Sequence, residues 1–268
     1  MIASARMYSV NAATAAAWRT LLEWVAARAG VACEVIDYPP PQPLSSLWAR
    51  PDLCCAFMCG YPFARAVPQP TILAAPVPSP SRYGGRPVYG TDIVVRADSS
   101  FARLDDAFGR RFAYTTEDSQ SGWHAPRLLF APHARMRGHP LFAAIVGPLV
   151  TPRDVALAIA GGDADAGPLD SYAHDLMRLH EPALATQLRV VATTPLTPIP
   201  PLVGAPSMAA SDARRMTDAL LAVAGAPELE RLRAALLLRA FAAVTAASYD
   251  GLVAHASEAD ALGYPRIA

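Results

Sequence analysis

One short segment carries the residue types best suited to hold an anion: Asp118-Ser119-Gln120-Ser121-Gly122, hereafter the serine loop. The surrounding pattern places it after a predicted strand and before a predicted helix. A helix N-terminus presents unpaired backbone N–H groups and about half a positive charge. The hydroxyls of Ser119 and Ser121 add donors, and Gly122 lets an oxyanion approach the backbone closely. The serine loop therefore predicts a cradle for a phosphate-like group, with simple N-capping by a serine as the alternative.

Three further side chains stand near the ends of predicted strands. Asp170 follows a short strand over 164–169 and precedes a helix, so it could cap that helix or receive a cationic group of a ligand. Tyr61 comes just after a strand, and Tyr89 lies just inside another. Tyrosines at such places can wall a pocket and donate one hydrogen bond. Burial in the core is the alternative for both tyrosines.

The composition excludes several kinds of chemistry. The sequence has no lysine, which rules out a pyridoxal Schiff base and a P-loop lysine. Neither the four cysteines nor the six histidines show the spacing of a metal site, so we expect no metal and no cofactor. The formal net charge is zero, which gives no global reason to bind nucleic acid or an anionic membrane. A serine hydrolase is a weak alternative, because the chain lacks G-x-S-x-G.

The elements that must position these residues follow an alternating pattern of strands and helices. That alternation predicts an α/β fold with mainly parallel sheets flanked by helices. Residues 52–58 read as a strand covered on both faces, and residues 211–262 read as mostly helical. The 268 residues suit one large or two modest domains. No run is long and apolar enough to span a membrane.

The order of these segments resembles the phosphate/phosphite/phosphonate solute-binding family of ABC importers, the PhnD-like branch of type 2 periplasmic binding proteins. The resemblance covers most of residues 1–205. The segments that carry it are SARMYSVNAATAAAW, RPDLCCAFMCGYPF, PVYGTDIVVRADSSF, YTTEDSQSGWHAPRLLF, AIAGGDADAGPLDSY and LRVVATTPLTPIPPLV. The serine loop is the most specific of them.

The resemblance assigns roles to particular residues. In that family the serine loop holds the phosphonate oxygens, a role that falls here on Ser119, Gln120 and Ser121. The family often has threonine between the two serines, where this sequence has the larger Gln120. A histidine and a glutamate that complete the aminophosphonate site have no clear counterpart in this sequence.

The same resemblance extends to the other side chains. In that family a tyrosine of the crossover strand helps to bind the ligand, and Tyr89 corresponds to this tyrosine. An aspartate of the second lobe can bind an amine of the ligand, and Asp170 corresponds to this aspartate. The family also uses a tyrosine of the first lobe, for which Tyr61 is the first choice and Tyr8 the second.

The resemblance implies a two-lobed, non-enzymatic binding protein. The expected division places 1–90 with 195–268 in one lobe and 91–194 in the other. These lobes would close by a hinge motion around a small oxyanion ligand. An ABC transporter permease is the implied partner, and the periplasm is the implied location.

Two alternatives stay open at this stage. The sequence starts without a signal peptide, so either a leader has been removed or the protein works in the cytoplasm. A cytoplasmic protein on this fold could be an enzyme of the lyase, dehydratase or cofactor-biosynthesis type that uses only Ser, Asp and Tyr groups.

Overall fold

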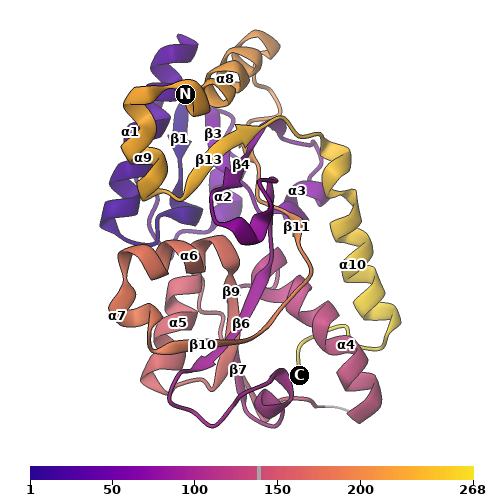
Figure 1. Ribbon diagram of the computed structural model, residues 1–268. Coiled ribbons are helices and arrows are strands. Elements are labelled where there is room, and N and C mark those ends of the chain that lie inside the picture. The colour runs from indigo at the N-terminus through magenta and orange to yellow at the C-terminus, as the bar shows by residue number, and fades with distance from the viewer. Residues whose placement is uncertain (138–139) are drawn as a thin grey trace. The chain divides into compact units, whose positions relative to one another are not determined.

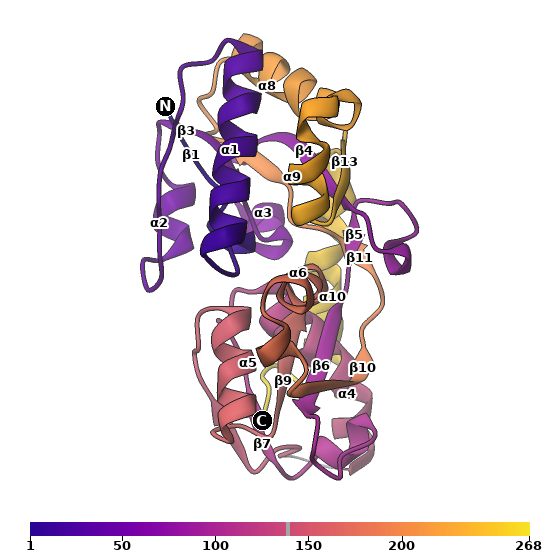
Figure 2. The same ribbon diagram turned by 60° about the vertical axis from the view of Figure 1, so that its left-hand side comes forward.

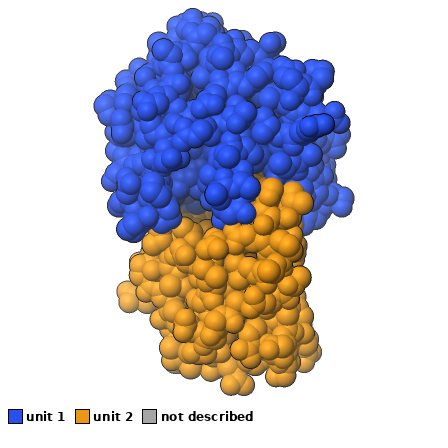
Figure 3. Space-filling model, turned by 90° about the vertical axis from the view of Figure 1, so that its left-hand side faces the viewer, with its two compact units in different colours: residues 1–88, 198–250 blue, residues 89–197, 251–268 orange. Residues whose placement is uncertain are grey.

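The chain, described here by a computed structural model for residues 1–137 and 140–268, divides into two units (Figures 1 and 2). Unit 1 comprises Met1–Val88 and Pro198–Asp250, and unit 2 comprises Tyr89–Thr197 and Gly251–Ala268. Figure 3 colours unit 1 blue and unit 2 orange. The short strands β5 (Val88–Tyr89) and β11 (Thr197–Pro198) pair with each other where the chain passes between the units.

Unit 1 is built on a six-stranded sheet in the order β13-β4-β12-β3-β1-β2. Strand β1, next to the edge strand β2, pairs parallel with β2 and with β3, whereas β12 and β13 run antiparallel to their neighbours. All residues of β3 are buried, as the sequence predicted. The strands are β1 (Ile2–Ser4), β2 (Glu34–Val35), β3 (Leu53–Phe57), β4 (Thr71–Pro78), β12 (Leu202–Gly204) and β13 (Leu238–Ala242).

The bounds of the long helix α1 (Ala12–Ala29) of unit 1 are set by capping residues at both ends. Asn11 and Thr14 form a capping box that satisfies the first backbone N–H groups. Gly30 ends the helix with a φ of 62°, a conformation that suits glycine. The other helices of unit 1 are α2 (Leu44–Trp48), α3 (Gly60–Arg65), α8 (Ala210–Ala222) and α9 (Glu230–Ala235).

The prediction of a mostly helical segment over 211–262 is wrong at its centre. Strand β13 lies there and pairs antiparallel with β4. Leu238 and Phe241 are buried in this strand. Burial at the sheet edge therefore decides the local structure against the helical propensity of the surrounding sequence.

The cysteines of β3 are core groups. Cys54 and Cys55 are buried and not disulfide-bonded. Desolvation by burial raises the pKa of the Cys55 thiol, and a hydrogen bond with Cys33 raises the pKa of Cys54. Both thiols are therefore neutral, which agrees with the predicted role of small apolar side chains.

Unit 2 is built on a five-stranded sheet in the order β10-β6-β9-β7-β8. Strand β7 pairs parallel with β8 and β9, while β6 pairs antiparallel with β9 and β10. The α/β class is as predicted, but both sheets are mixed rather than mainly parallel, because returning strands pair antiparallel in each. The strands are β6 (Thr91–Arg96), β7 (Arg111–Ala113), β8 (Ala144–Val146), β9 (Ala166–Asp170) and β10 (Leu188–Thr193).

The C-terminal residues belong to unit 2, whereas the sequence led us to place all of 195–268 in the first lobe. The buried guanidinium of Arg127 explains the difference. It donates hydrogen bonds to the Asp260 carboxylate at 2.6 Å and to the backbone carbonyls of Pro265 and Ala256. Tyr264 and Ile267 also join the apolar core of unit 2. The helices that supply or contact this unit are α4 (Ala125–Arg137), α5 (Pro152–Gly161), α6 (Ser171–His180), α7 (Pro182–Ala185) and α10 (Asp250–Ala261).

The helices of the described residues are too short or too polar to cross a bilayer.

Candidate functional site

The serine loop begins a helix in unit 2, as predicted, but the first turn is wider than an α-helical turn. Residues Gln120–His124 form a π-helical turn that continues into α4. The Ser119 carbonyl accepts hydrogen bonds from the backbone N–H groups of Trp123 and His124, both at 3.1 Å. The Ser119 hydroxyl accepts from the Gly122 N–H at 2.9 Å. Because this hydroxyl acts as an acceptor toward the backbone, its proton stays available for a ligand.

The second serine of the loop is held through its backbone and not through its side chain. The Thr91 hydroxyl of strand β6 donates to the Ser121 carbonyl at 3.1 Å. Ser121 is only 8% exposed, and among the described residues its hydroxyl has no hydrogen-bond partner. A hydroxyl in this state at a helix N-terminus is suited to bind a group that the protein itself does not supply.

Gly122 is required by packing. A Cβ at this position would lie 1.8 Å from the Thr115 hydroxyl oxygen and 3.0 Å from that of Ser119. The sequence predicted glycine here for the approach of a ligand. The structure adds a second reason, which is that the end of β7 and the start of the helix touch at this residue. Gln120 is also buried, with 1% exposure, so its contact with a ligand stays a prediction.

Strand pairing in unit 2 brings Asp170 to the same sheet edge as the serine loop. Asp170 is the last residue of β9, and the serine loop follows the carboxyl end of its parallel neighbour β7. Ligands of α/β proteins commonly bind at that edge. One Asp170 carboxylate oxygen accepts from the backbone N–H groups of Tyr172 and Ala173, at 2.9 and 3.0 Å. Asp170 is thus the N-cap of α6, and its role toward a cationic group of a ligand stays a prediction.

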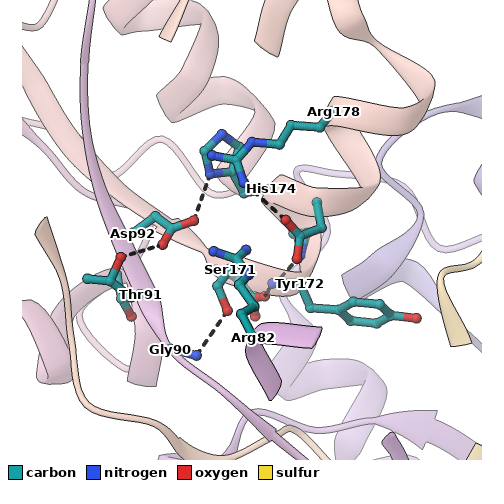
Figure 4. A network of polar contacts seen from close by, with 12 residues as sticks. Arg82, Gly90, Thr91, Asp92, Ser171, Tyr172, His174 and Arg178 are labelled. Carbon is teal, nitrogen blue, oxygen red and sulfur yellow. Dashed lines mark hydrogen bonds and ion pairs between the residues drawn. The ribbon is translucent and has the colours of Figure 1, made fainter. Parts of the chain in front are cut away.

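Tyr89 lies next to this edge at the start of the crossover segment. It is buried, and the following N–H, that of Gly90, donates to the Ser171 hydroxyl at 2.9 Å (Figure 4). Thr91 stands opposite Asp170 in the register of β6 and β9. The crossover strand, α6 and the serine loop are therefore tied together within unit 2, while contact of Tyr89 with a ligand stays a prediction.

A buried Asp–His contact near this edge was missed by the sequence analysis. The Asp92 carboxylate contacts Nδ1 of His174 at 2.8 Å and accepts from the Thr193 hydroxyl at 2.8 Å (Figure 4). Asp92 and His174 are 0% and 1% exposed. An acid inside the apolar run VYGTDIVVR was a signal in itself, because a buried carboxylate needs a partner. The pair joins β6 to α6 and holds the segment that carries Thr91.

The two tyrosines predicted in the first lobe lie in unit 1 and differ in environment. The Tyr61 hydroxyl accepts from Arg65 at 2.9 Å, and that guanidinium also lies 5.5 Å from the ring centre. Tyr8 is buried, with its ring edge-on to Phe57 at 4.9 Å. Tyr8 is thus packed as a core residue. Roles of Tyr61 and Tyr8 in binding stay predictions.

Within residues 1–137 and 140–268, no group of three or more His, Cys, Asp or Glu side chains is arranged to hold a metal ion. The polar atoms gathered at the sheet edge of unit 2 are hydroxyls, backbone N–H groups and a capping carboxylate. The hydroxyls and N–H groups of this set can donate hydrogen bonds to an oxyanion, whereas the carboxylate only accepts them.

Comparison with known proteins gives this geometry a context. Residues 9–249 match the sequence model of a family described as ABC transporter, phosphonate, periplasmic substrate-binding protein. No curated protein sequence matches the chain.

Many solved structures share the fold, among them the following three. The binding-protein component of an ABC phosphonate transporter from Pseudomonas aeruginosa has a TM-score of 0.80 and 18% identity, covering 98% of this chain and 87% of that one. PhnD1 from Prochlorococcus marinus, in complex with methylphosphonate, has a TM-score of 0.74 and 13% identity, with coverage of 97% and 98%. A Xanthomonas citri protein bound to ATP has a TM-score of 0.65 and 18% identity, with coverage of 98% for both chains.

Proposed function

Because this chain belongs to the family of ABC transporter phosphonate periplasmic substrate-binding proteins, we propose that it binds a small phosphonate- or phosphate-like oxyanion through the serine loop of unit 2. The family consists of solute-binding proteins of importers, and it gives no support to the enzyme alternative. The protein is therefore a solute-binding protein, and the proposal concerns its ligand and the residues that hold it.

The observation that supports the serine loop most directly is the Ser121 hydroxyl. It is nearly buried, lies at the start of a helix and has no partner among the described residues. The Ser119 hydroxyl, which accepts from Gly122, can donate its own proton beside it. Each hydrogen bond to a charged group contributes about 1.5–3 kcal/mol. Three or four such bonds supply much of the roughly 8 kcal/mol of a micromolar complex, before the cost of association.

In this proposal, neutral hydrogen-bond donors stabilise the negative charge of the ligand. Because the sequence has no lysine, the loop offers hydroxyls, backbone N–H groups and the partial charge of the helix N-terminus. The family also suggests a transporter permease as partner and the periplasm as location, and we include both in the proposal.

Isothermal titration with methylphosphonate, inorganic phosphate, phosphite and sulfate tests the proposal. The double variant Ser119→Ala/Ser121→Ala should bind the preferred anion at least about tenfold more weakly, because two charge-assisted bonds are lost. Ser100→Ala removes an exposed hydroxyl of unit 2 and is the matched control. Titration curves of the double variant that equal those of the wild type would refute the role of the serine loop.

Asp170 provides a separate test of ligand charge. Asp170→Asn keeps a side-chain oxygen that can accept from Tyr172 and Ala173, so the cap and the fold remain. If the aspartate meets a cation, the variant loses affinity for 2-aminoethylphosphonate and keeps its affinity for methylphosphonate. Equal loss for both ligands would show that Asp170 acts only through the helix.

A further inference from the structure

Thr115 is a buried polar residue next to the proposed site and has no role assigned in it. It lies just beyond the carboxyl end of β7 in unit 2 and is 5% exposed. Its backbone is fixed, because its carbonyl accepts from the Val150 N–H at 3.1 Å. Its hydroxyl is fully buried and, in the described part of the chain, has no hydrogen-bond partner.

A buried hydroxyl without a partner is costly and uncommon. Leaving such a group unsatisfied costs about 1–3 kcal/mol, and the large majority of buried side-chain polar atoms have a partner. Alanine or valine at position 115 would avoid that cost. The Thr115 hydroxyl is therefore a candidate donor to a group that the chain does not supply.

The surroundings of the Thr115 hydroxyl indicate what that partner is. Its oxygen and that of Ser119 lie 1.8 and 3.0 Å from the point that a Cβ of residue 122 would occupy. Both hydroxyls thus border Gly122, and the next residue back is Ser121, whose hydroxyl also has no partner among the described residues. The hydroxyls of Thr115 and Ser119 thus meet beside Gly122, and Ser121 belongs to the same turn.

We propose that Thr115 supplies a third hydroxyl donor to the anion held by the serine loop, and this inference rests on the proposed function. The ligand class that fits is a tetrahedral oxyanion with three terminal oxygens, such as a phosphonate or a phosphate monoester. Ser119, Ser121 and Thr115 provide one hydroxyl for each oxygen. A hydroxyl can also accept a hydrogen bond from a protonated oxygen of the ligand, so the site binds the singly and the doubly charged forms.

Titration of the full chain with methylphosphonate and inorganic phosphate tests the role of Thr115. Thr115→Ala should lower the affinity for both anions about tenfold, the loss expected for one charge-assisted bond. Thr115→Ser keeps the hydroxyl and should stay within about threefold of the wild type. Thr116→Ala, at the neighbouring half-buried threonine, is the matched control and should bind like the wild type.

The melting temperatures of the ligand-free variants distinguish a role of Thr115 in ligand binding from a role in packing. The melting temperature of ligand-free Thr115→Ala should equal or exceed that of the wild type, because an unsatisfied buried group is removed. Thr115→Val keeps the shape of the side chain without its hydroxyl, and it decides the question if the alanine variant is less stable. Wild-type affinity in Thr115→Val and Thr115→Ala would overturn the inference.

The outcomes also separate this inference from the proposal beneath it. If Ser119→Ala/Ser121→Ala weakens binding while the hydroxyl-free variants of Thr115 bind normally, the serine loop holds the anion and Thr115 plays no part. If the wild type binds neither methylphosphonate nor phosphate, the proposed function itself fails, and this inference fails with it.

Discussion

The two ends of strand β7 are built from polar residues that are used in opposite ways. At the amino end, Arg111 has partners for both its backbone N–H and its side chain. Its backbone N–H and its guanidinium donate three hydrogen bonds to the Asp165 carboxylate at 2.9–3.0 Å and one to the Gly162 carbonyl at 2.8 Å. This end fastens β7 to the turn between α5 and β9.

At the carboxyl end, Thr115 and Ser121 are buried, and their hydroxyls have no partner within the described ranges. Only glycine at position 122 leaves room for the end of β7 and the start of the helix to approach so closely. The contrast separates partnered polar groups, which stabilise the unit, from the unpartnered hydroxyls that we propose to bind the ligand. Substitutions at the two ends should therefore separate stability from binding.

The largest effect is expected for Gly122→Ala at the carboxyl end. The new methyl group would collide with the Thr115 hydroxyl, so the free energy of unfolding should fall by about 1–3 kcal/mol and methylphosphonate binding should be lost. Urea denaturation and isothermal titration measure the two effects. Gly251→Ala is the control, because a Cβ there meets nothing within 4 Å. Normal stability and binding in Gly122→Ala would contradict the close packing described for this turn.

A smaller effect, confined to stability, is expected for Asp165→Asn at the amino end. The hydrogen bonds from Arg111 hold the pKa of Asp165 below its usual value. This depressed pKa means that the ion pair contributes its stability above the unfolded pKa of about 3.9 and loses it as the pH falls through the folded value.

The Asp165→Asn variant should therefore unfold with about 1 kcal/mol less free energy at pH 7, since the pair is bidentate but partly exposed. The difference from the wild type should shrink as the pH falls below about 4. Urea denaturation at both pH values measures it, and methylphosphonate affinity should stay unchanged. A loss of affinity equal to that of the serine-loop variants would abolish the distinction between the two ends.

The smallest effect is expected for Val150→Gly, beside the carboxyl end. Val150 has a φ of 66°, in the left-handed region that disfavours β-branched side chains. Relief of that strain, of about 1 kcal/mol or more, should slightly exceed the entropic cost of glycine, about 0.5–1 kcal/mol. The melting temperature should rise slightly. Val150→Ala keeps the unfavourable φ and should gain less, and a fall in the glycine variant would show that the valine side chain matters more than its backbone.

The sequence predicted the parts of the site that depend on near neighbours. The strand, serine loop and helix follow one another within about twenty residues, and Ser119 caps the turn through a bond to Gly122, three residues on. Asp170 caps α6 by the same kind of local bond. These interactions connect residues two or three apart in the chain, so residue type and spacing are sufficient to indicate them.

Other features required contacts between distant segments. Asp92 and His174 are 82 residues apart, and no local pattern pairs them. Strand β13 was predicted as helix, because its partner β4 lies more than 150 residues earlier in the chain. The C-terminal segment was placed with the wrong unit, because the buried Arg127 that holds it is 129 residues from Ala256.

The amino acid sequence by itself determined the α/β class, the serine loop and the caps of its helices, because short-range hydrogen bonds and apolar periodicity are written in adjacent residues. Only the tertiary structure decided which hydroxyls remain without a partner. Thr115 is an ordinary threonine in the sequence. Sheet register and the close approach of Gly122 bury it, and the burial of a group that nothing in the described chain satisfies is what makes it a candidate for binding the anion.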